Sequence, residues 1–390
     1  MSRRPTLLST TRAVGIVANE FFDPALGRMG GFGWAARTSA ESLAGAREID
    51  RRPVLLAGRG GLGAHRPGRH ESGIPLVRYD DDRKRYARRL DRARVGLFLT
   101  VDYRPNYLPV LEARSVPAIV WVRDPREPSD VERIATLELP SRVERPQGID
   151  AIDCRSLGAH VARTESTGGP VAFASPAPSL AAQRMRSTYD VDPATLHFLP
   201  NPVPPVAAVA RRAERPRVAF LGRLDPIKRP WVFVEVARRF PHVEFVMLGR
   251  SHFAGPGSWL PARLPPNVVV LGHVDGASKR SMLGSAWMIV NTSIHESLPI
   301  SFLEALHCGT PIVSCQDPEG VTSRFGRYVG RVDGSGLDAL DVFAEEIETL
   351  LDDEGLRLRL GAEGCEWARA NHTPTRFLEV FDELATSFGE

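Results

Sequence analysis

Short apolar runs alternate along the chain with longer stretches whose apolar residues recur at helical spacing. In the first half, the apolar runs predict strands, and the stretches between them predict helices. The predicted strands cover 13–18, 54–57, 74–79, 95–101, 118–123 and 171–175, and the predicted helices cover 34–44, 83–94 and 107–114. Because these strands are apolar along nearly their whole length, they predict a parallel sheet with helices on both faces.

The alternation restarts after a proline-rich break at 199–205, which reads Leu-Pro-Asn-Pro-Val-Pro-Pro. Two Rossmann-like α/β domains explain both series. We place the first domain at 1–195, the second at 196–370 and a final helical segment at 371–390. In the second series the predicted strands cover 217–221, 243–248, 268–271, 288–291 and 311–314, and the predicted helices cover 231–239, 279–285, 301–308, 340–351 and 375–387.

Composition supports two domains, because 390 residues with 43% hydrophobic content exceed what one core usually holds. No apolar run approaches the ~20 residues of a membrane span, and the start of the chain lacks the apolar core of a secretory signal. We therefore expect a cytoplasmic protein. The four cysteines have no metal-type spacing and are interpreted as reduced thiols; they are Cys154, Cys308, Cys315 and Cys365.

Positive charge is concentrated in the first half of the chain. The first 200 residues hold 30 Lys and Arg against 23 Asp and Glu, within a net charge of +3 for the whole chain. This excess permits a peripheral contact between the first domain and the anionic inner face of a membrane. It does not indicate nucleic acid, because aromatic residues are few and no recognisable binding module accompanies the charge.

Two cations follow the first predicted strand of the second domain. Gly222 permits a tight exit from that strand, at the edge where open α/β sheets bind their ligands. Arg223 and Lys228, five residues apart, could converge on a diphosphate, with Arg223 making a forked contact. The alternative is that both are solvated surface cations.

The segment 291–311 predicts a strand, a loop, a helix and the next strand. Pro299 suits the first helical turn, whose free amides and positive dipole end would face a ligand beyond the strand. Glu304 would lie about 9 Å from Leu298 along the helix axis, and its side chain would lean back toward that ligand. Glu296 lies in the loop before the helix. The alternative makes Glu296 a partner of the helix dipole and Glu304 a solvated residue.

A glycine-rich loop follows the first predicted strand of the chain. The segment 28–34 reads Arg-Met-Gly-Gly-Phe-Gly-Trp and precedes a helical run. Its glycines allow the backbone to approach a ligand closely, and the helix start again offers amide donors. A flexible turn without a ligand is an equally good interpretation of this segment alone.

Together these motifs resemble the retaining GT-B glycosyltransferases of family 4, the glycogen-synthase-like group also called glycosyl transferases group 1. The resemblance covers most of the chain in the expected order. It implies two Rossmann-like domains facing each other across a cleft, with the acceptor on the first domain and the donor on the second. It also implies that the last helix packs back onto the first domain, with Trp367 and Phe377 as apolar anchors. The similar features are the glycine loop, the element from Gly222 to Lys228, the glutamate pair, the run Glu304-Ala305-Leu306-His307-Cys308-Gly309-Thr310-Pro311, and the segments 200–203 and 271–274.

The resemblance also implies roles for single residues. Arg223 and Lys228 would hold the donor diphosphate and stabilise the leaving group, and Glu296 would contact the transferred sugar. Transfer from a UDP- or GDP-sugar to a glycan, lipid-linked or small-molecule acceptor would retain the anomeric configuration and use no metal or other cofactor. The implied donor-binding residues are Glu304 at the ribose, Val274 at the base, and Gly31, Gly33, Ser297, Leu298, Pro299 and Ile300.

The chain departs from the family pattern at two points. Ser297, Leu298 and Pro299 stand where the family often has glycines, and Pro299 cannot donate an amide hydrogen bond. The family often carries a histidine at the end of a strand in the first domain, where this chain has Arg123 followed by Asp124. We assign Arg123 and Asp124 to the acceptor side of the cleft. A nucleotide-sugar epimerase and a non-catalytic sugar-nucleotide-binding protein remain alternatives.

Two further motifs have plainer explanations. The segment 58–63 satisfies G-x-G-x-x-G, but no helix follows it directly, so a surface loop is favoured over a dinucleotide site. The acidic run 80–82 could bind Mg²⁺ or Mn²⁺ in a one-domain, metal-dependent glycosyltransferase. An acidic start to the basic helix that follows is the simpler explanation, because the helix dipole favours that order of charges.

Overall fold

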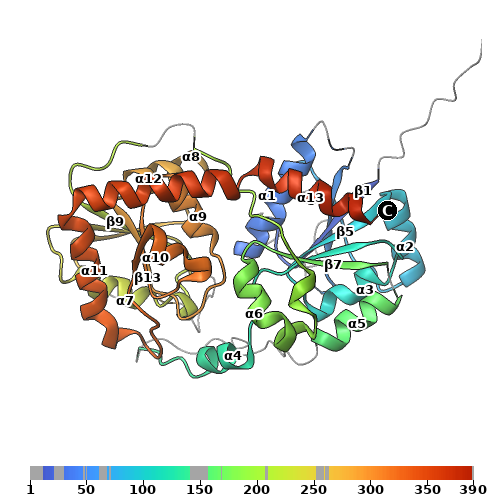
Figure 1. Cartoon of the computed structure of the whole chain (residues 1–390), viewed down its shortest axis with the longest axis horizontal. Coiled ribbons are helices and arrows are strands. Elements are labelled where there is room, and N and C mark those ends of the chain that lie inside the picture. Colours follow the sequence, from blue (N-terminus) through green and yellow to red (C-terminus); the bar gives the residue numbers. More distant parts are fainter. Residues whose placement is uncertain are drawn as a thin grey trace, which may run out of the picture.

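A computed structural model gives the arrangement of the chain and confirms the two Rossmann-like domains (Figure 1). The structure describes residues 12–21, 30–46, 49, 51–60, 68–69, 72–140, 157–167, 169–206, 210–251, 259 and 263–388. Arg28 and Met29 of the glycine loop, Cys154, and residues 61–63 of the G-x-G-x-x-G segment lie outside the described residues.

The first domain is an eight-stranded sheet in which all neighbours are parallel except β3 and β4. Its central strands β1 and β5 are buried along their whole length, as their continuous apolar sequences predict. In sheet order the strands are β3 (Gly68–Arg69), β4 (Pro75–Val77), β2 (Pro53–Ala57), β1 (Ala13–Ala18), β5 (Val95–Val101), β6 (Ala118–Trp121), β7 (Val171–Ser175) and β8 (Leu196–Phe198). The helices are α1 (Gly31–Gly45), α2 (Arg83–Arg92), α3 (Leu108–Leu111), α4 (Pro128–Ala135), α5 (Leu157–Thr167) and α6 (Pro178–Tyr189).

The second domain is a six-stranded sheet whose paired strands are all parallel. Helix α7 is almost entirely buried against it, which explains why its sequence is apolar on all sides. In sheet order the strands are β11 (Val268–Gly272), β10 (Glu244–Leu248), β9 (Arg217–Leu221), β12 (Met288–Asn291), β13 (Ile312–Ser314) and β14 (Gly326–Tyr328). The helices are α7 (Pro230–Ala237), α8 (Gly276–Ser285), α9 (Ile300–His307), α10 (Val321–Phe325), α11 (Leu340–Asp352) and α12 (Glu354–Asn371).

The last helix, α13 (Pro374–Ser387), lies on the first domain (Figure 1). It packs against α1, and its apolar face joins the core cluster of β1, β2 and α1. Phe377 contacts Trp121 with 5.6 Å between ring centroids. Trp367 was wrongly predicted as a second anchor on the first domain: it lies on α12, and its ring is 5.4 Å from that of Phe325 in the second domain.

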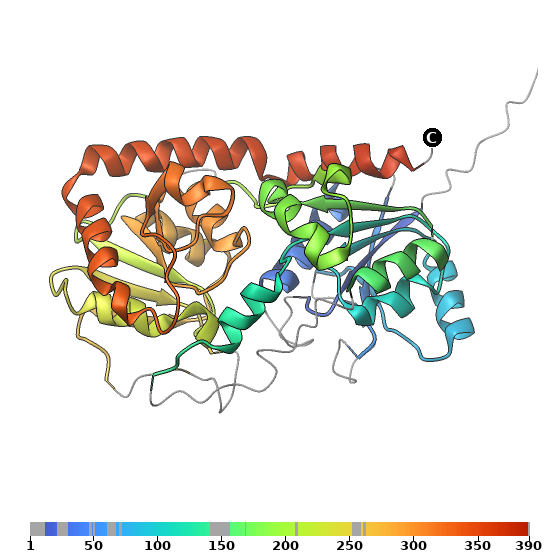
Figure 2. The same cartoon turned by 60° about the horizontal axis from the view of Figure 1, so that its bottom comes forward.

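A second connection between the domains runs through α4, which lies between them (Figure 2). Ile134 and Leu137, on and just after α4, pack against Ile294 of the second domain. Arg133 forms an ion pair of 2.6 Å with Asp333. The two domains are therefore held together by apolar and ionic contacts as well as by the chain connections.

Several element boundaries differ from the sequence prediction. Strand β8 pairs with β7, so the first sheet extends to Phe198, beyond the boundary expected at 195. The helix expected over 107–114 is regular only at Leu108–Leu111, after a short 3₁₀ turn. Helices α4, α5, α6, α10 and α12 were not predicted.

Candidate functional site

Besides a pocket lined by Trp34, Lys279 and His307, the described part of the interdomain cleft contains two pockets that share lining residues, which we call pocket A and pocket B. Pocket A measures about 960 Å³ and pocket B about 760 Å³, and both volumes include space open to solvent. Both lie where the strands of the second sheet end, the edge at which open α/β sheets bind ligands. Shared lining residues make them one continuous candidate site; these are Gly30, Gly31, Arg223, Lys228, Glu296, Pro299 and Ile300.

The exit of β9 places Arg223 in both pockets through an unusually close approach of two backbones. A Cβ atom on Gly249 would lie 1.8 Å from the carbonyl oxygen of Gly222. Only glycine fits there, so the ends of β9 and β10 lie against each other. Arg223 forms an ion pair of 3.2 Å with Asp225, which is buried, while its own side chain stays 36% exposed. The guanidinium is thus held at the pocket wall without being enclosed.

Arg229 supports the loop from which Lys228 projects. Its side chain is fully buried, and its backbone is left-handed, with φ of 44°. The guanidinium donates to the carbonyl oxygens of Thr292 and Ser293, at 2.7 and 3.2 Å. These bonds tie the loop after β9 to the loop after β12, and thereby place Lys228 beside Glu296.

Three donors converge on one oxygen of Glu296. Its Oε1 accepts from Lys228 Nζ at 2.5 Å, Ser293 Oγ at 2.6 Å and Asn291 Nδ2 at 3.0 Å. Burial raises the pKa of Glu296, but the ammonium of Lys228 and the two neutral donors outweigh it and leave the pKa below its usual value. Glu296 is therefore an ionised, positioned carboxylate. No described residue donates to its second oxygen.

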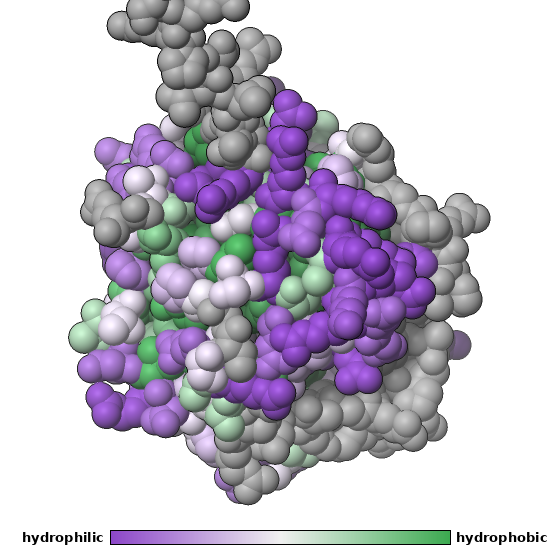
Figure 3. Space-filling model, turned by 90° about the vertical axis from the view of Figure 1, so that its right-hand side faces the viewer, coloured by the Kyte–Doolittle hydropathy of each residue, from purple (hydrophilic) through white to green (hydrophobic). Residues whose placement is uncertain are grey.

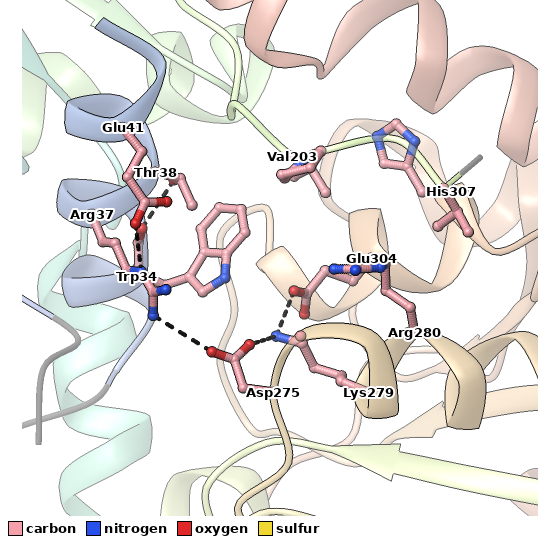
Figure 4. A pocket seen from close by; sticks show the side chains of 13 residues that line it. Trp34, Arg37, Thr38, Glu41, Val203, Asp275, Lys279, Arg280, Glu304 and His307 are labelled. Atoms are coloured by element: carbon pink, nitrogen blue, oxygen red, sulfur yellow. Dashed lines mark hydrogen bonds and ion pairs between the residues drawn. The ribbon is translucent and has the colours of Figure 1, made fainter. Parts of the chain in front are cut away.

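Glu304 forms an ion pair with Lys279 (Figure 4), a residue that the sequence did not single out. The distance is 2.7 Å, and Lys279 also contacts Asp275 at 3.2 Å. Burial lowers the pKa of Lys279, but the two carboxylates raise it above its usual value. Asp275 in turn lies 3.5 Å from Arg37 on α1, so this chain of charges reaches the first domain.

The first domain closes the cleft with the start of α1. Gly31 is exposed and lines both pockets, and a Cβ there would meet nothing within 4 Å. Gly33, predicted to approach the donor, is instead buried in the first turn of α1, while Gly30 takes its place in the lining. Trp34 points from α1 toward Glu304 and Lys279 (Figure 4) and packs with second-domain core residues.

The remaining residues assigned to the donor lie where the sequence placed them relative to α9. Ser297 and Leu298 line pocket B, whereas Pro299 and Ile300 line both pockets at the start of the helix. Val274 follows β11 and lines pocket A. The structure therefore brings the assigned residues of the second domain to one cleft.

Asp124 and Arg123 line pocket B, and Asp124 makes a contact that the sequence did not reveal. It lies 2.7 Å from His295 of the second domain, whose other ring nitrogen is 3.4 Å from Asp130. Arg123 is 6% exposed and its guanidinium lies over the ring of Trp121, 4.3 Å from the centroid. His295 stands directly before Glu296, but only the folded chain shows that it faces two carboxylates.

The acidic run 80–82 has a local role. Asp82 caps α2 by accepting from the amide of Arg85, and Asp80 binds the side chains of Arg85 and Arg89. Among the described residues, no cluster of three or more His, Cys, Asp or Glu side chains is arranged to hold a metal ion. Described cysteines Cys308, Cys315 and Cys365 are free thiols.

Comparison with known proteins relates the second domain to one family. Residues 207–367 match the family model described as glycosyl transferases group 1. The D-inositol 3-phosphate glycosyltransferase of Salinispora arenicola is 30% identical over 44% of this chain and 42% of its own length. That of Mycobacteroides abscessus is 30% identical over 34% of each chain. The matched segments thus span less than half of these relatives.

Solved structures extend the likeness of fold to both domains. Sucrose-phosphate synthase from Thermosynechococcus elongatus superposes with a TM-score of 0.65 at 15% identity, over 96% of this chain and all of the other. HepE of Anabaena, in complex with UDP-glucose, gives 0.66 at 12% identity, over 96% and 99%. The chain therefore has the GT-B fold, and its residues 207–367 are similar to the glycosyl transferases of group 1.

Proposed function

We propose that this protein is a retaining glycosyltransferase that moves a hexosyl group from a UDP- or GDP-sugar to a hydroxyl acceptor. One observation carries the proposal: Arg223, Lys228 and the start of α9 line the same cleft as Glu296 and Glu304. Two cations and the positive end of a helix are a favourable site for a diphosphate. The relatives' names support glycosyl transfer, and the UDP-glucose complex of HepE supports a nucleotide-sugar donor.

In this proposal the donor lies along pocket A. Its diphosphate contacts Arg223, Lys228 and the amides at the start of α9, and its ribose lies near Glu304. The backbone at Val274 contacts the base. Lys279 holds Glu304 in place through their ion pair, which makes Lys279 a positioning residue rather than a group that reacts.

The chemistry follows from where charge develops in the reaction. Departure of the nucleoside diphosphate leaves negative charge on an oxygen beside Arg223 and Lys228, which stabilise it without reorganising. Glu296 orients Lys228 and contacts the sugar. The acceptor hydroxyl attacks from the same face as the departing phosphate, and its proton passes to the phosphate oxygen whose bond to the sugar breaks. Glycan, lipid-linked and small-molecule acceptors all offer this hydroxyl. The cationic pair supplies the charge for this step, so we expect activity to persist in chelator.

A thermal-shift screen followed by a transfer assay tests the function. Bound nucleotide stabilises the folded state by about 2.7 kcal/mol at a concentration of 100 Kd, so UDP, GDP and ADP can be ranked on one plate. The preferred nucleotide sugar is then incubated with an acceptor panel, and products are identified by NMR, which also reports the anomeric configuration. Epimerised sugar without acceptor would identify an epimerase, and binding without any product would identify a sugar-nucleotide-binding protein.

We further propose a peripheral contact between the first domain and anionic membrane through α2. Hydrophilic residues dominate the face of the first domain that carries this helix (Figure 3), and Arg83, Lys84, Arg88 and Arg92 are exposed on it. No helix in the described part of the chain is long and apolar enough to cross a membrane. The contact would therefore be electrostatic and sensitive to salt.

Sedimentation with vesicles measures this contact. We expect the protein to bind vesicles containing phosphatidylserine at low ionic strength, and to be released by 0.5 M salt or by the variant R88E/R92E. Equal binding to neutral vesicles, or unchanged binding by the variant, would refute the contact. The variant should fold normally, because the buried residues of α2, Tyr86 and Leu90, are not substituted in it.

A further inference from the structure

Among the described residues, one buried guanidinium in the cleft has no anionic partner. Arg123 is 6% exposed, and its Nε and Nη1 atoms have no hydrogen-bond partner among the described residues. It lies over the ring of Trp121, which covers one face of the guanidinium but accepts no hydrogen bond in its plane. Leaving a buried charge without such partners is costly, so this arrangement calls for an explanation.

The two carboxylates whose charges act on Arg123 are paired with other groups. Asp102 forms an ion pair of 2.9 Å with Arg104 and accepts from the backbone amides of Arg123 and Asp124. Asp124 binds Arg126 at 2.7 Å through one oxygen and His295 at 2.7 Å through the other. Both carboxylates therefore act on the guanidinium of Arg123 only through space.

Arg123 nevertheless remains charged at neutral pH. Burial lowers its pKa to about 10, and the charges of Asp102 and Asp124 oppose that effect. The side chain is thus a cation that keeps its donors, held at the cleft by a hydrogen-bonded backbone and a stacked ring.

A second unpartnered donor lines the same pocket from the opposite domain. The Oγ atom of Ser297 is buried without a hydrogen-bond partner among the described residues. Ser297 and Arg123 both line pocket B, together with Lys228 and Glu296 of the proposed transfer site. Lys228 is paired with Glu296, and Arg223 with Asp225. Arg123 differs from these cations because no carboxylate of the part of the chain that the structure describes is bound to it.

We propose that Arg123 and Ser297 receive an oxyanion, a carboxylate or a phosphate, carried by one of the substrates in addition to the donor diphosphate. A planar guanidinium matches either group through two parallel hydrogen bonds. The oxyanion belongs to the transferred sugar, as the carboxylate of a uronic acid, or to the acceptor, as a phosphate or carboxylate. The inference rests on the proposed function and names the substrate class for the same cleft.

Calorimetry on the full-length protein separates these two sources. UDP-glucose and UDP-glucuronate differ only in the carboxylate, and inorganic phosphate added to UDP-saturated protein represents an acceptor anion. Each probe is titrated into the wild type, Arg123→Gln and Arg186→Gln. Arg186 is a matched control, since its side chain is 75% exposed on α6, outside the lining of both pockets.

We expect Arg123→Gln to weaken binding of one oxyanion probe roughly 10- to 100-fold, the range for a lost hydrogen-bonded charge pair, and UDP binding less than twofold. Loss for UDP-glucuronate assigns the oxyanion to the sugar, and loss for phosphate assigns it to the acceptor. Arg186→Gln should leave every affinity unchanged. If Arg123→Gln does not fold, Arg123→Lys, which keeps the charge but not the fork, and Ser297→Ala should each weaken the same probe severalfold.

Two results would overturn the inference. One is equal binding of both oxyanion probes by the wild type and the variants, which would leave Arg123 a structural group stacked on Trp121. The other is an equal loss of UDP affinity, which would assign Arg123 to the donor diphosphate. Because phosphate can also be titrated into nucleotide-free protein, failure of the proposed transferase function would be seen separately, as absence of nucleotide binding.

Discussion

At the scale of single residues, Lys228 is the one cation among the three donors to Glu296 Oε1. The substitution Lys228→Met keeps the stem but leaves a buried carboxylate without its counterion. We expect kcat/KM to fall by about 100-fold or more, as when a positioned charge-stabilising donor is removed from other active sites. Because Lys228 is the main cause that lowers the pKa of Glu296, the acid limb of the pH profile should also move to higher pH.

The lowered pKa of Glu296 also determines how this residue contributes to the stability of the folded protein at different pH. The pKa of Glu296 is depressed in the folded protein, so its contribution is present above the ordinary value of 4.5 and is lost as the pH falls through the folded value. Arg238→Met is the control, since Arg238 is a 49% exposed cation on the second domain that pairs with Glu235 outside both pockets. If kcat/KM of Lys228→Met equals that of the wild type, Lys228 is not part of the transfer site.

At the scale of elements, the ends of β9 and β10 meet at a contact that tolerates no side chain. In Gly249→Ala the new Cβ would fall 1.8 Å from the carbonyl oxygen of Gly222, so one strand end must move. We expect the free energy of unfolding to drop by about 1 to 3 kcal/mol, as for other overpacked sites. Donor affinity should fall as well, because Arg223 follows directly on the displaced strand. Chemical denaturation and nucleotide titration measure the two effects.

Gly355→Ala provides the comparison within the same domain. Gly355 is exposed near the start of α12, where a Cβ would meet only Asp353 at 3.4 Å. Alanine favours a helix by up to ~1 kcal/mol over glycine, so this variant should be neutral or more stable. If Gly249→Ala binds the nucleotide as tightly as the wild type, the ends of β9 and β10 do not set the position of Arg223.

The elements also show what local sequence can and cannot specify. Strands β1 and β5 were predicted because a central parallel strand is apolar throughout. Strand β8 was missed, since three half-buried or exposed residues at a sheet edge leave no such signal. Helix α9 with its Glu304, and Glu296 in the loop before it, follow from a local strand-loop-helix pattern. The pairings of Glu304 with Lys279 and of His295 with Asp124 join distant segments, so spacing along the chain gives no indication of them.

At the scale of the whole molecule, His295 links the closed arrangement of the domains to pH. It is 4% exposed and lies between Asp124 and Asp130 of the first domain. Arg126 and Arg184 face the same group, each paired with one of these carboxylates. Burial lowers the pKa of His295, but the carboxylates outweigh burial and raise the pKa above 6.5. The protonated imidazole therefore holds the two domains together.

Because the pKa of His295 is raised, its contact with the two carboxylates weakens as the pH increases. The contact contributes fully at and below pH 6.5 and is lost as the pH rises through the folded pKa. We expect the radius of gyration in small-angle scattering, and the KM for the donor, to increase from pH 6.5 toward pH 9. His295→Gln should show the more open form at every pH, at a cost of about 1 to 3 kcal/mol in closure.

The other interdomain contacts decide how large this change can be. Burial raises the pKa of Asp333, but its pairing with Arg133 leaves that pKa below the usual value, and the contact of Ile134 with Ile294 carries no charge. Opening should therefore be partial. His242→Gln serves as the control. It also replaces a histidine, but His242 is exposed on the second domain, away from the first domain. The same pH dependence in His295→Gln as in the wild type would assign it to another group. A flat profile in the wild type would mean that α4 and the chain connections alone keep the cleft closed.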